Sequence, residues 1–237
     1  MTALLRREGL KINRKRVQRL WREAGLKVPA RTVKKRRLGG SENACFRRRA
    51  ERPNHVWSHD FVMDQTSDGR RLKILTVVDE YTRECLALEA ERCIEAVDVV
   101  EVLRKIITVR GVPENIRSDN GGEFIAQVVR KFLQSSGAQT LYIEPGAPWE
   151  NGFAESFFSR LRDEMLNIEE FMNLAEARWF ARRRQQEHNE ERPHSSLGYR
   201  TPAEFASQCA ASVPASAAPQ PSLQQHTAVS LTQPILS

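Results

Sequence analysis

Three acidic residues stand at positions where an unpaired negative charge would be costly. Asp60 lies among apolar neighbours in the segment VWSHDFV, Asp119 precedes an Asn-Gly-Gly turn, and Glu155 lies in the first turns of an amphipathic segment. Because the chain holds 30 acidic residues, spacing alone is weak evidence. The expected strand and helix positions are stronger evidence, because a buried carboxylate there needs a cation or several hydrogen bonds.

These carboxylates favour Mg²⁺ or Mn²⁺ chemistry. Hard oxygen ligands without thiolate or paired imidazole suit these ions better than zinc. Two such ions about 4 Å apart can activate a water or a 3′-hydroxyl and stabilise the leaving oxygen of an in-line phosphoryl displacement. The alternative makes Asp60 a capped polar group of the core, Asp119 a turn residue and Glu155 a surface acid. That alternative weakens when all three residues are considered together.

The elements that would position these residues alternate between strands and helices from residue 53 onward. Three strands joined by short turns predict an antiparallel meander, at residues 56–63, 72–78 and 84–90. The remaining expected elements are a helix at 95–109, a strand at 115–118, a helix at 123–135, a strand at 140–143 and a helix at 152–165. This order is ribonuclease H-like. We therefore predict an α/β fold with a mixed five-stranded sheet flanked by helices. Beyond it, a charged helix is expected at 173–189 and a final short turn after Thr201-Pro202.

Positive charge is concentrated at the N-terminus. Residues 1–52 hold 18 Lys and Arg against 4 Asp and Glu, whereas residues 53–237 hold 19 against 26. A basic arm joined to a mildly acidic domain indicates a nucleic-acid partner, although a solvated charged surface is the alternative. Two helices, expected at 3–8 and 13–24, resemble a helix-turn-helix remnant. The expected DNA contacts of this arm are Arg14, Lys15, Arg19, Lys34, Lys35, Arg36 and Arg37.

Five segments resemble the catalytic subunit, OrfB, of bacterial insertion-sequence transposases with a retroviral-integrase-type core. They are WSHDFV at 57–62, LTVVDEYTRECL at 75–86, RSDNGGEF at 117–124, PWENGFAESFFSRLRDE at 148–164 and RPHSSLGYRTPAEF at 192–205. They run through residues 53–207 in the family's order, and 35 residues separate Asp119 from Glu155, as in the family's signature. Residues 3–29 resemble the helix-turn-helix-like region that precedes this core.

The resemblance implies an Asp-Asp-Glu triad at Asp60, Asp119 and Glu155, with Arg162 in contact with DNA. It also implies dependence on Mg²⁺, with two ions expected, for strand cleavage and strand transfer at insertion-sequence ends. Partners implied are element-end and target DNA, further copies of the chain, and an upstream-frame subunit. The arm is expected to start partway into a longer helical region. Departures from the family's pattern occur at Gly122, Phe158-Ser159 and His188, none of them a triad position.

Two other functions remain open from the sequence: a catalytically silent DNA-binding regulator of transposition, and a structure-selective nuclease on the same core. Lesser candidates have simpler interpretations. Asp64 is expected at a strand-end turn, with a metal contact on the strand face of Asp60 as the alternative. Asp79-Glu80 is expected at a hairpin turn, and Glu123 at a helix start. Trp149 and Tyr142 are expected in the core, with base stacking as the alternative. His194 and Arg192 fall in the post-catalytic segment without an evident mechanism.

Cysteine spacing and the length of apolar runs limit which disulfides, metal sites and cellular locations are expected. The four cysteines show neither a CxxC pair nor a disulfide pattern and are read as reduced thiols. The pair His55 and His59 falls in strand-like sequence, which disfavours a metal site. No apolar run approaches the roughly 18 residues of a membrane span, and no signal sequence is evident, so a cytoplasmic location is expected. Residues 208–237, which lack charged side chains, are predicted to be disordered.

Overall fold

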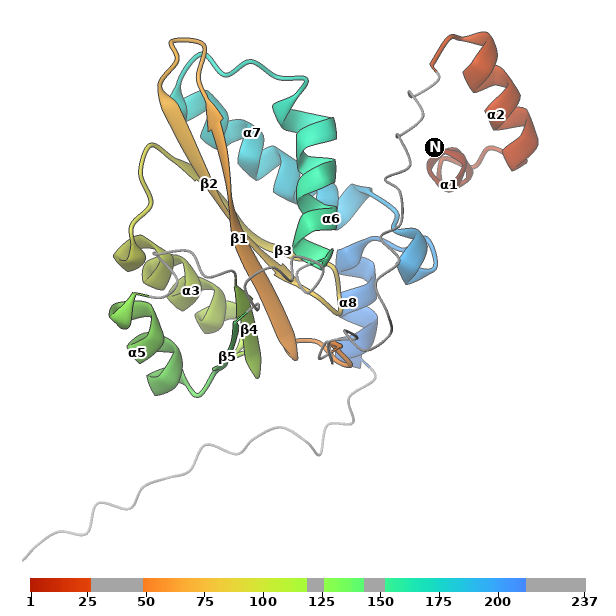
Figure 1. Ribbon diagram of the computed structural model, residues 1–237. Coiled ribbons are helices and arrows are strands. Elements are labelled where there is room, and N and C mark those ends of the chain that lie inside the picture. Colours follow the sequence, from red (N-terminus) through yellow and green to blue (C-terminus); the bar gives the residue numbers. More distant parts are fainter. Residues whose placement is uncertain (27–48, 119–125, 143–151, 212–237) are drawn as a thin grey trace, which may run out of the picture.

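A computed structural model describes residues 1–26, 49–118, 126–142 and 152–211, without the side chains of Tyr142 and residues 152–155. Figure 1 shows a twisted sheet with helices on both faces and a separate helical arm at the N-terminus. The helices are α1 (Thr2–Arg7), α2 (Arg14–Glu23), α3 (Ala96–Arg110), α5 (Gln127–Ser136), α6 (Gly152–Leu161), α7 (Leu174–Gln186) and α8 (Pro202–Ala211). The strands are β1 (Val56–Gln65), β2 (Arg71–Asp79), β3 (Cys85–Glu91), β4 (Asn115–Ser118) and β5 (Gln139–Tyr142).

The five strands form one mixed sheet in the order β3-β2-β1-β4-β5. Strands β1, β2 and β3 pair antiparallel, which confirms the predicted meander. Strand β4 pairs parallel with β1, and β5 pairs parallel with β4. The predicted mixed five-stranded sheet is therefore confirmed, with β1 at its centre.

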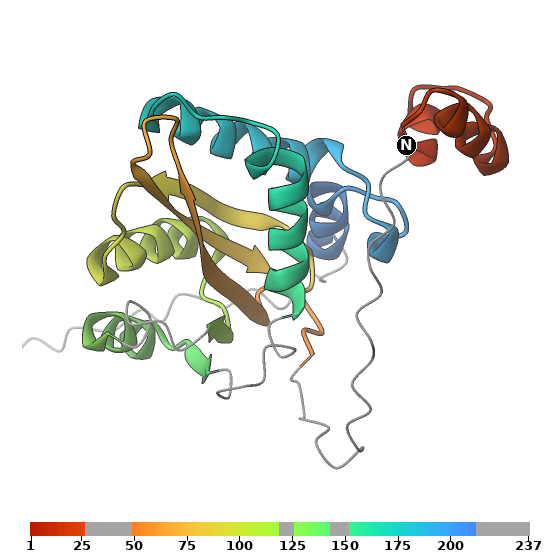
Figure 2. The ribbon, with the colours of Figure 1, turned by 45° about the horizontal axis from the view of Figure 1, so that its top comes forward.

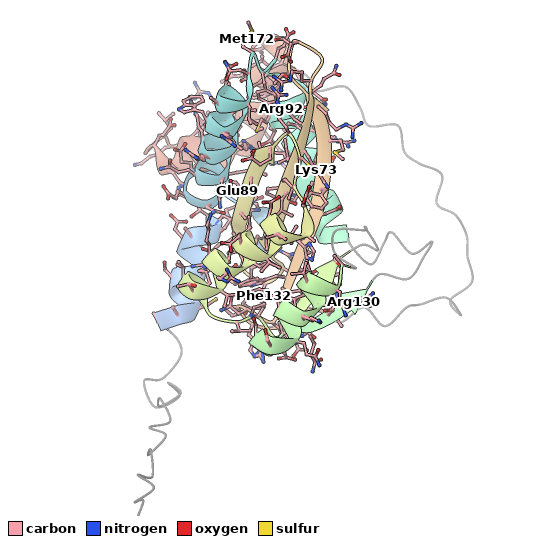
Figure 3. All side chains as sticks on the ribbon, turned by 90° about the vertical axis from the view of Figure 1, so that its left-hand side faces the viewer. Lys73, Glu89, Arg92, Arg130, Phe132 and Met172 are labelled. Carbon is pink, nitrogen blue, oxygen red and sulfur yellow. The ribbon has the colours of Figure 1, made fainter. Side chains whose placement is uncertain are left out.

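Helices α3 and α5 cover one face of the sheet. Their apolar side chains, among them Leu103 and Leu133, pack with Trp57 of β1 and Ile116 of β4 in one buried cluster. Figure 3 views the molecule from this side, with Phe132 and Arg130 on α5 below Lys73 of β2. Helix α3 starts with a capping box between Glu95 and Asp98 and ends at Arg110, and the next residue, Gly111, has a φ of 85° that suits glycine. This helix layer therefore buries the apolar side chains on one face of the sheet.

Helices α6 and α7 cover the opposite face, as Figure 2 shows. Phe157 and Leu161 of α6 and Ala177 of α7 pack with Val62 and Ile74 in a second buried cluster. The sequence predicted one helix over 152–165, but α6 ends at Leu161 and continues as a π-helical turn, η3 (Arg162–Leu166). The expected helix over 173–189 likewise gives way to a π-helical turn, η4 (Glu187–Glu191).

The C-terminal end of the described chain differs from the expectation. A final short turn was expected after Thr201, but the ten-residue helix α8 forms, so residues 208–211 are helical and not disordered. A capping box explains this helix: the Glu204 carboxylate accepts a hydrogen bond from the Thr201 N–H at 2.8 Å, and the Thr201 hydroxyl accepts one from the Glu204 N–H at 3.2 Å. Pro202 at the first helical position adds to that signal. Residues 212–237 lie outside the described part of the chain.

Candidate active site

Asp60 lies in the middle of β1 on the face of the sheet that α6 covers. Side chains alternate along a strand, and Val62 belongs to the α6 and α7 cluster whereas Phe61 packs against the opposite one. Asp60 is half-buried. Its Oδ1 accepts a hydrogen bond from the Phe61 N–H at 2.7 Å, and its carbonyl accepts one from the Thr76 hydroxyl at 3.2 Å. The predicted mid-strand position of this carboxylate is confirmed.

The other two predicted carboxylates lie outside what the structure describes. Asp119 follows Ser118, the last residue of β4, and is not among the described residues. Glu155 belongs to α6 by its backbone, but its side chain is not described. Within the described residues no group of three His, Cys, Asp or Glu could hold a metal ion. The convergence of the three carboxylates therefore stays a prediction.

A buried ion pair lies on the same face of the sheet, close to the end of β4. Nη1 of Arg117 lies 2.5 Å from Oε1 of Glu80, and the two side chains are 5% and 0% exposed. The Glu80 N–H donates to the carbonyl of Val56 at 3.0 Å, so Glu80 lies beside the start of β1. Glu80 lies in the predicted turn after β2, and the ion pair is a second role that the sequence did not indicate. Its partner is 37 residues away, and no local pattern indicated the contact.

Asp79, the last residue of β2, caps the turn that the sequence predicted at Asp79-Glu80. Its Oδ1 accepts hydrogen bonds from the N–H groups of Tyr81 and Thr82 at 2.8 and 3.1 Å, and its Oδ2 accepts one from the Asn54 N–H at 2.8 Å. Burial raises the pKa of this carboxyl, because desolvation outweighs the three hydrogen bonds, which act in the opposite direction. Asp79 thus fixes the β2–β3 turn and ties it to the chain entering β1.

Two buried histidines, His188 and His194, pack next to Phe157 of α6. The His188 ring packs edge-on against Phe157 at 5.0 Å and against the His194 ring at 4.7 Å, both between centroids. The carbonyl of Arg83 lies 2.9 Å from Nε2 of His188, which must therefore donate. Desolvation lowers the pKa of His188 to about 4 and that of His194 to about 3, so both rings are neutral at pH 7. They act here as aromatic packing groups with one polar contact.

The segment after α6 is held by one carboxylate and two guanidinium groups. Glu164 of η3 forms ion pairs with Arg184 of α7 and with Arg192, which follows η4. The two arginine side chains are 14% and 30% exposed, and desolvation is the largest effect lowering their pKa values. The sequence indicated no role for Arg192. The structure shows that it links the post-catalytic segment to the end of α6 through Glu164.

Comparisons with known proteins bear on this arrangement. Residues 50–148 and 136–202 each match a family described as integrase core domain, and residues 1–36 match an HTH-like domain. The putative transposase InsK of insertion sequence element IS150 from Escherichia coli K12 is 27% identical over 218 residues, covering 88% of this chain and 76% of that protein. A 31.7 kDa protein of insertion element IS407 from Burkholderia multivorans is 40% identical over 216 residues, covering 91% of this chain and 77% of that protein. The chain belongs to the integrase-core transposases of insertion sequences, of OrfB type.

A solved structure agrees with the fold of the transposase. A chain of the simian T-cell lymphotropic virus intasome, in complex with PP2A regulatory subunit B56 gamma, matches with a TM-score of 0.54 at 15% identity. The match covers 80% of this chain and 62% of that chain. It confirms the predicted ribonuclease H-like integrase core. The family establishes DNA transposition as the function class and DNA strand transfer as the enzyme class.

The predicted DNA contacts of the transposase are exposed wherever the structure describes them. Arg162 is exposed at the start of η3. On α2, Arg14, Lys15 and Arg19 are exposed, with Arg19 placed 3.6 Å from Glu23. The linker residues Lys34, Lys35, Arg36 and Arg37 lie outside the described residues. DNA binding fits the HTH-like match, whereas the individual contacts stay predictions.

The lesser candidates fall into simpler roles where they are described. Asp64 was expected at a turn, but it lies within β1, which extends to Gln65. It is half-buried, shares the face of Asp60 by alternation, and accepts a hydrogen bond from the Gln65 N–H at 2.8 Å. Nδ1 of His55 accepts one from the Glu51 N–H at 3.0 Å. Among the described cysteines none forms a disulfide. Glu123 and Trp149 lie outside the described residues. No helix in the described ranges is long and apolar enough to cross a membrane.

Proposed function

We propose that Asp60, Asp119 and Glu155 form the catalytic triad of a metal-dependent DNA strand-transferase that cuts and rejoins DNA at insertion-sequence ends. The observation that carries the proposal is the pairing of β1 with β4. These strands run parallel with Ser58 opposite Arg117. If this register is continued by two residues on each strand, Asp60 would lie opposite position 119, on the face that α6 covers.

The placement of α6 supports the third member. Phe157 and Leu161 bury one side of this helix against the face of the sheet that carries Asp60. Residues three, four and seven positions apart share a helix face, which groups position 155 with Phe158, Ser159 and Arg162. Phe158 and Ser159 are half-buried, so this group of residues flanks the buried side. A glutamate there would approach the two strand aspartates from the helix side.

The donor set fits divalent ions of the Mg²⁺ and Mn²⁺ type. Three carboxylates offer hard oxygen ligands, and the Asp60 side chain is half-buried, accessible enough to serve as a ligand. We assign Asp60 and Asp119 to a first ion and Glu155 to a second. Bound divalent ions of this kind lower the pKa of an attacking hydroxyl and neutralise charge on the phosphoryl oxygens.

The residues of the chain would orient the reaction. The nucleophile, a water or a 3′-hydroxyl, loses its proton and forms a new P–O bond in line with the P–O bond that breaks, and the leaving oxygen takes up a proton to become a 3′-hydroxyl. Arg162 would contact a neighbouring phosphate, because a guanidinium donates two parallel hydrogen bonds to such a group. We also propose that the active form is a homo-oligomer bound to DNA.

Labelled element-end DNA incubated with the full chain and Mg²⁺ tests the proposal. We expect cleaved and joined products from the parent protein and none from Asp119→Asn. End binding is measured in parallel by gel shift. Equal end binding with no product from either protein would favour the silent DNA-binding regulator. Cleavage of branched DNA without joining would favour the structure-selective nuclease.

A further inference from the structure

We propose that Glu164 is a positioning residue for DNA binding. By pairing with Arg184 and Arg192, it fixes the rotation of α6 and η3 about their common axis, and with it the direction in which Arg162 points. The proposal rests on the contact between Arg162 and a DNA phosphate that belongs to the proposed function. Glu164 itself acts only through Arg162.

The buried side of α6 and η3 is apolar. Phe157, Leu161 and Met165 follow one another at intervals of four residues and pack in the cluster that α7 and the sheet share. The burial of apolar surface is favourable but non-directional. These contacts therefore hold the helix against the sheet, but they define its rotation less sharply than a directional polar contact does.

The contacts of Glu164 are directional. Its carboxylate pairs with the guanidinium of Arg184, on α7, and with that of Arg192, in the segment after η4. All three side chains are partly buried, so water screens the pairs less than it would on an open surface. A guanidinium is planar and donates in fixed directions. Two such groups from two different elements fix where residue 164 lies around the helix axis.

Arg162 and Glu164 lie on opposite flanks of the buried side. Two residues correspond to roughly half a turn of a helix. Arg162 is exposed and follows the half-buried Phe158 by one turn. Glu164 instead shares the flank of Phe157, against which the His188 ring of η4 packs. A rotation that moved Glu164 away from α7 would therefore turn Arg162 through the same angle.

Both residues belong to the π-helical turn η3. The Asn167 N–H donates to the carbonyl of Arg162, five residues earlier, at 2.9 Å. Turns of this kind are rare and occur frequently at functional sites. Glu164 lies in the middle of the turn and connects it to α7 and to the segment after η4. The direction of Arg162 thus depends on an ion pair made two residues away.

DNA binding by the full chain in EDTA, where no cleavage occurs, tests the proposal. The Kd for a fluorescein-labelled element-end duplex is measured by anisotropy at several NaCl concentrations, for the wild type, Arg162→Gln, Glu164→Gln and the double variant. Loss of one phosphate contact should lower the slope of log Kd against log salt by about 0.9. We expect this loss in each single variant, with a Kd roughly tenfold higher. The double variant should bind no more weakly than either single variant.

The sign of the change separates positioning from charge. Glu164→Gln removes a negative charge, which by itself should strengthen binding to a polyanion. A smaller folded fraction would lower the amount of active protein but leave the salt slope unchanged. Glu164→Asp, which keeps the carboxylate on a shorter side chain, should recover part of the affinity. If Glu164→Gln does not fold, Arg184→Lys combined with Arg192→Lys keeps the charge, loses both planar donors and should lower the slope in the same way.

The matched control is Glu170→Gln, which removes an exposed carboxylate of the same segment and should keep the wild-type slope. Binding by Glu164→Gln that is as tight as in the wild type, or additive weakening in the double variant, would overturn the proposal. An unchanged slope in Arg162→Gln would overturn the proposed phosphate contact and this proposal together. A lower slope in Arg162→Gln but not in Glu164→Gln would count against the positioning role alone.

Discussion

The two faces of the sheet differ in the side chains that they carry. Helices α3 and α5 close one face with an apolar cluster built around Trp57 and Leu103. Helices α6 and α7 close the other, where an apolar cluster adjoins Asp60, the Glu80–Arg117 pair and the Glu164 ion pairs. Substitutions on the first face should therefore change stability, and those on the second should change chemistry or the position of α6.

The largest expected effect is on Asp60. Asp60→Asn should lower strand transfer by at least about a thousandfold, because a neutral amide is a poor ligand for a divalent ion. The melting temperature should stay near that of the wild type. Asp64→Asn is the matched control: the two carboxylates share a strand and a face, and each accepts a hydrogen bond from the next N–H. Similar losses in both variants would contradict the special role of Asp60.

The next largest effect is expected on the opposite face. Leu103 is completely buried between α3 and the sheet. Leu103→Ala should lower the free energy of unfolding by about 2 to 5 kcal/mol, through lost burial and the cavity left behind. Urea denaturation measures this change. Strand transfer per folded molecule should stay unchanged, and a selective loss of activity would break the division between the faces. Val109→Ala on the same helix, at 81% exposure, should have almost no effect.

A smaller effect is expected at the end of α6. Glu164→Gln removes the carboxylate that Arg184 and Arg192 share and leaves only the Glu187 contact of Arg184, at a cost of about 1 to 3 kcal/mol. Because Glu164 follows α6, hydrogen exchange of the amides in α6 and η3 should also speed up. Glu170→Gln, which changes an exposed carboxylate of the same segment, serves as the control. Unchanged exchange in α6 would show that this cluster does not support the helix.

The smallest effect is a dependence of stability on pH. Burial lowers the pKa of His188 to about 4, helped by Arg192, Arg184 and Arg160, whereas the unfolded chain has a value near 6.5. Above pH 6.5 the His188 ring is neutral in the folded and the unfolded state, so its contribution to the free energy of unfolding is constant. As the pH falls from 6.5 to about 4, the unfolded state binds more protons than the folded state. The free energy of unfolding therefore falls by about 1.4 kcal/mol per pH unit.

His188→Phe tests that dependence while keeping an aromatic ring against Phe157. Urea denaturation at pH 7 and pH 5.5 should show a smaller loss of stability in the variant than in the wild type. His194 and His59, whose pKa values burial lowers to about 3, would continue to contribute. The same pH slope in both proteins would show that His188 is not the titrating group.

Local sequence pattern was sufficient for most of the element order. The alternation around Asp60 predicted a strand that β1 confirms, and the expected strand at 115–118 agrees with β4. These elements follow from contacts between residues close in sequence, such as hydrogen-bonding periodicity and capping. The same kind of local signal lies at Thr201 and Glu204, where a capping box starts α8.

The sequence by itself determined which residue types could hold metal ions, the order of strands and helices, and the charge of the arm. Only the tertiary structure decided that Arg117 meets Glu80 across 37 residues, that Arg192 meets Glu164 across 28, and that His188 packs on Phe157. Such contacts depend on which strands become neighbours and which helix covers which face. No periodicity within a segment records that choice, because it is made by the burial of whole elements against one another.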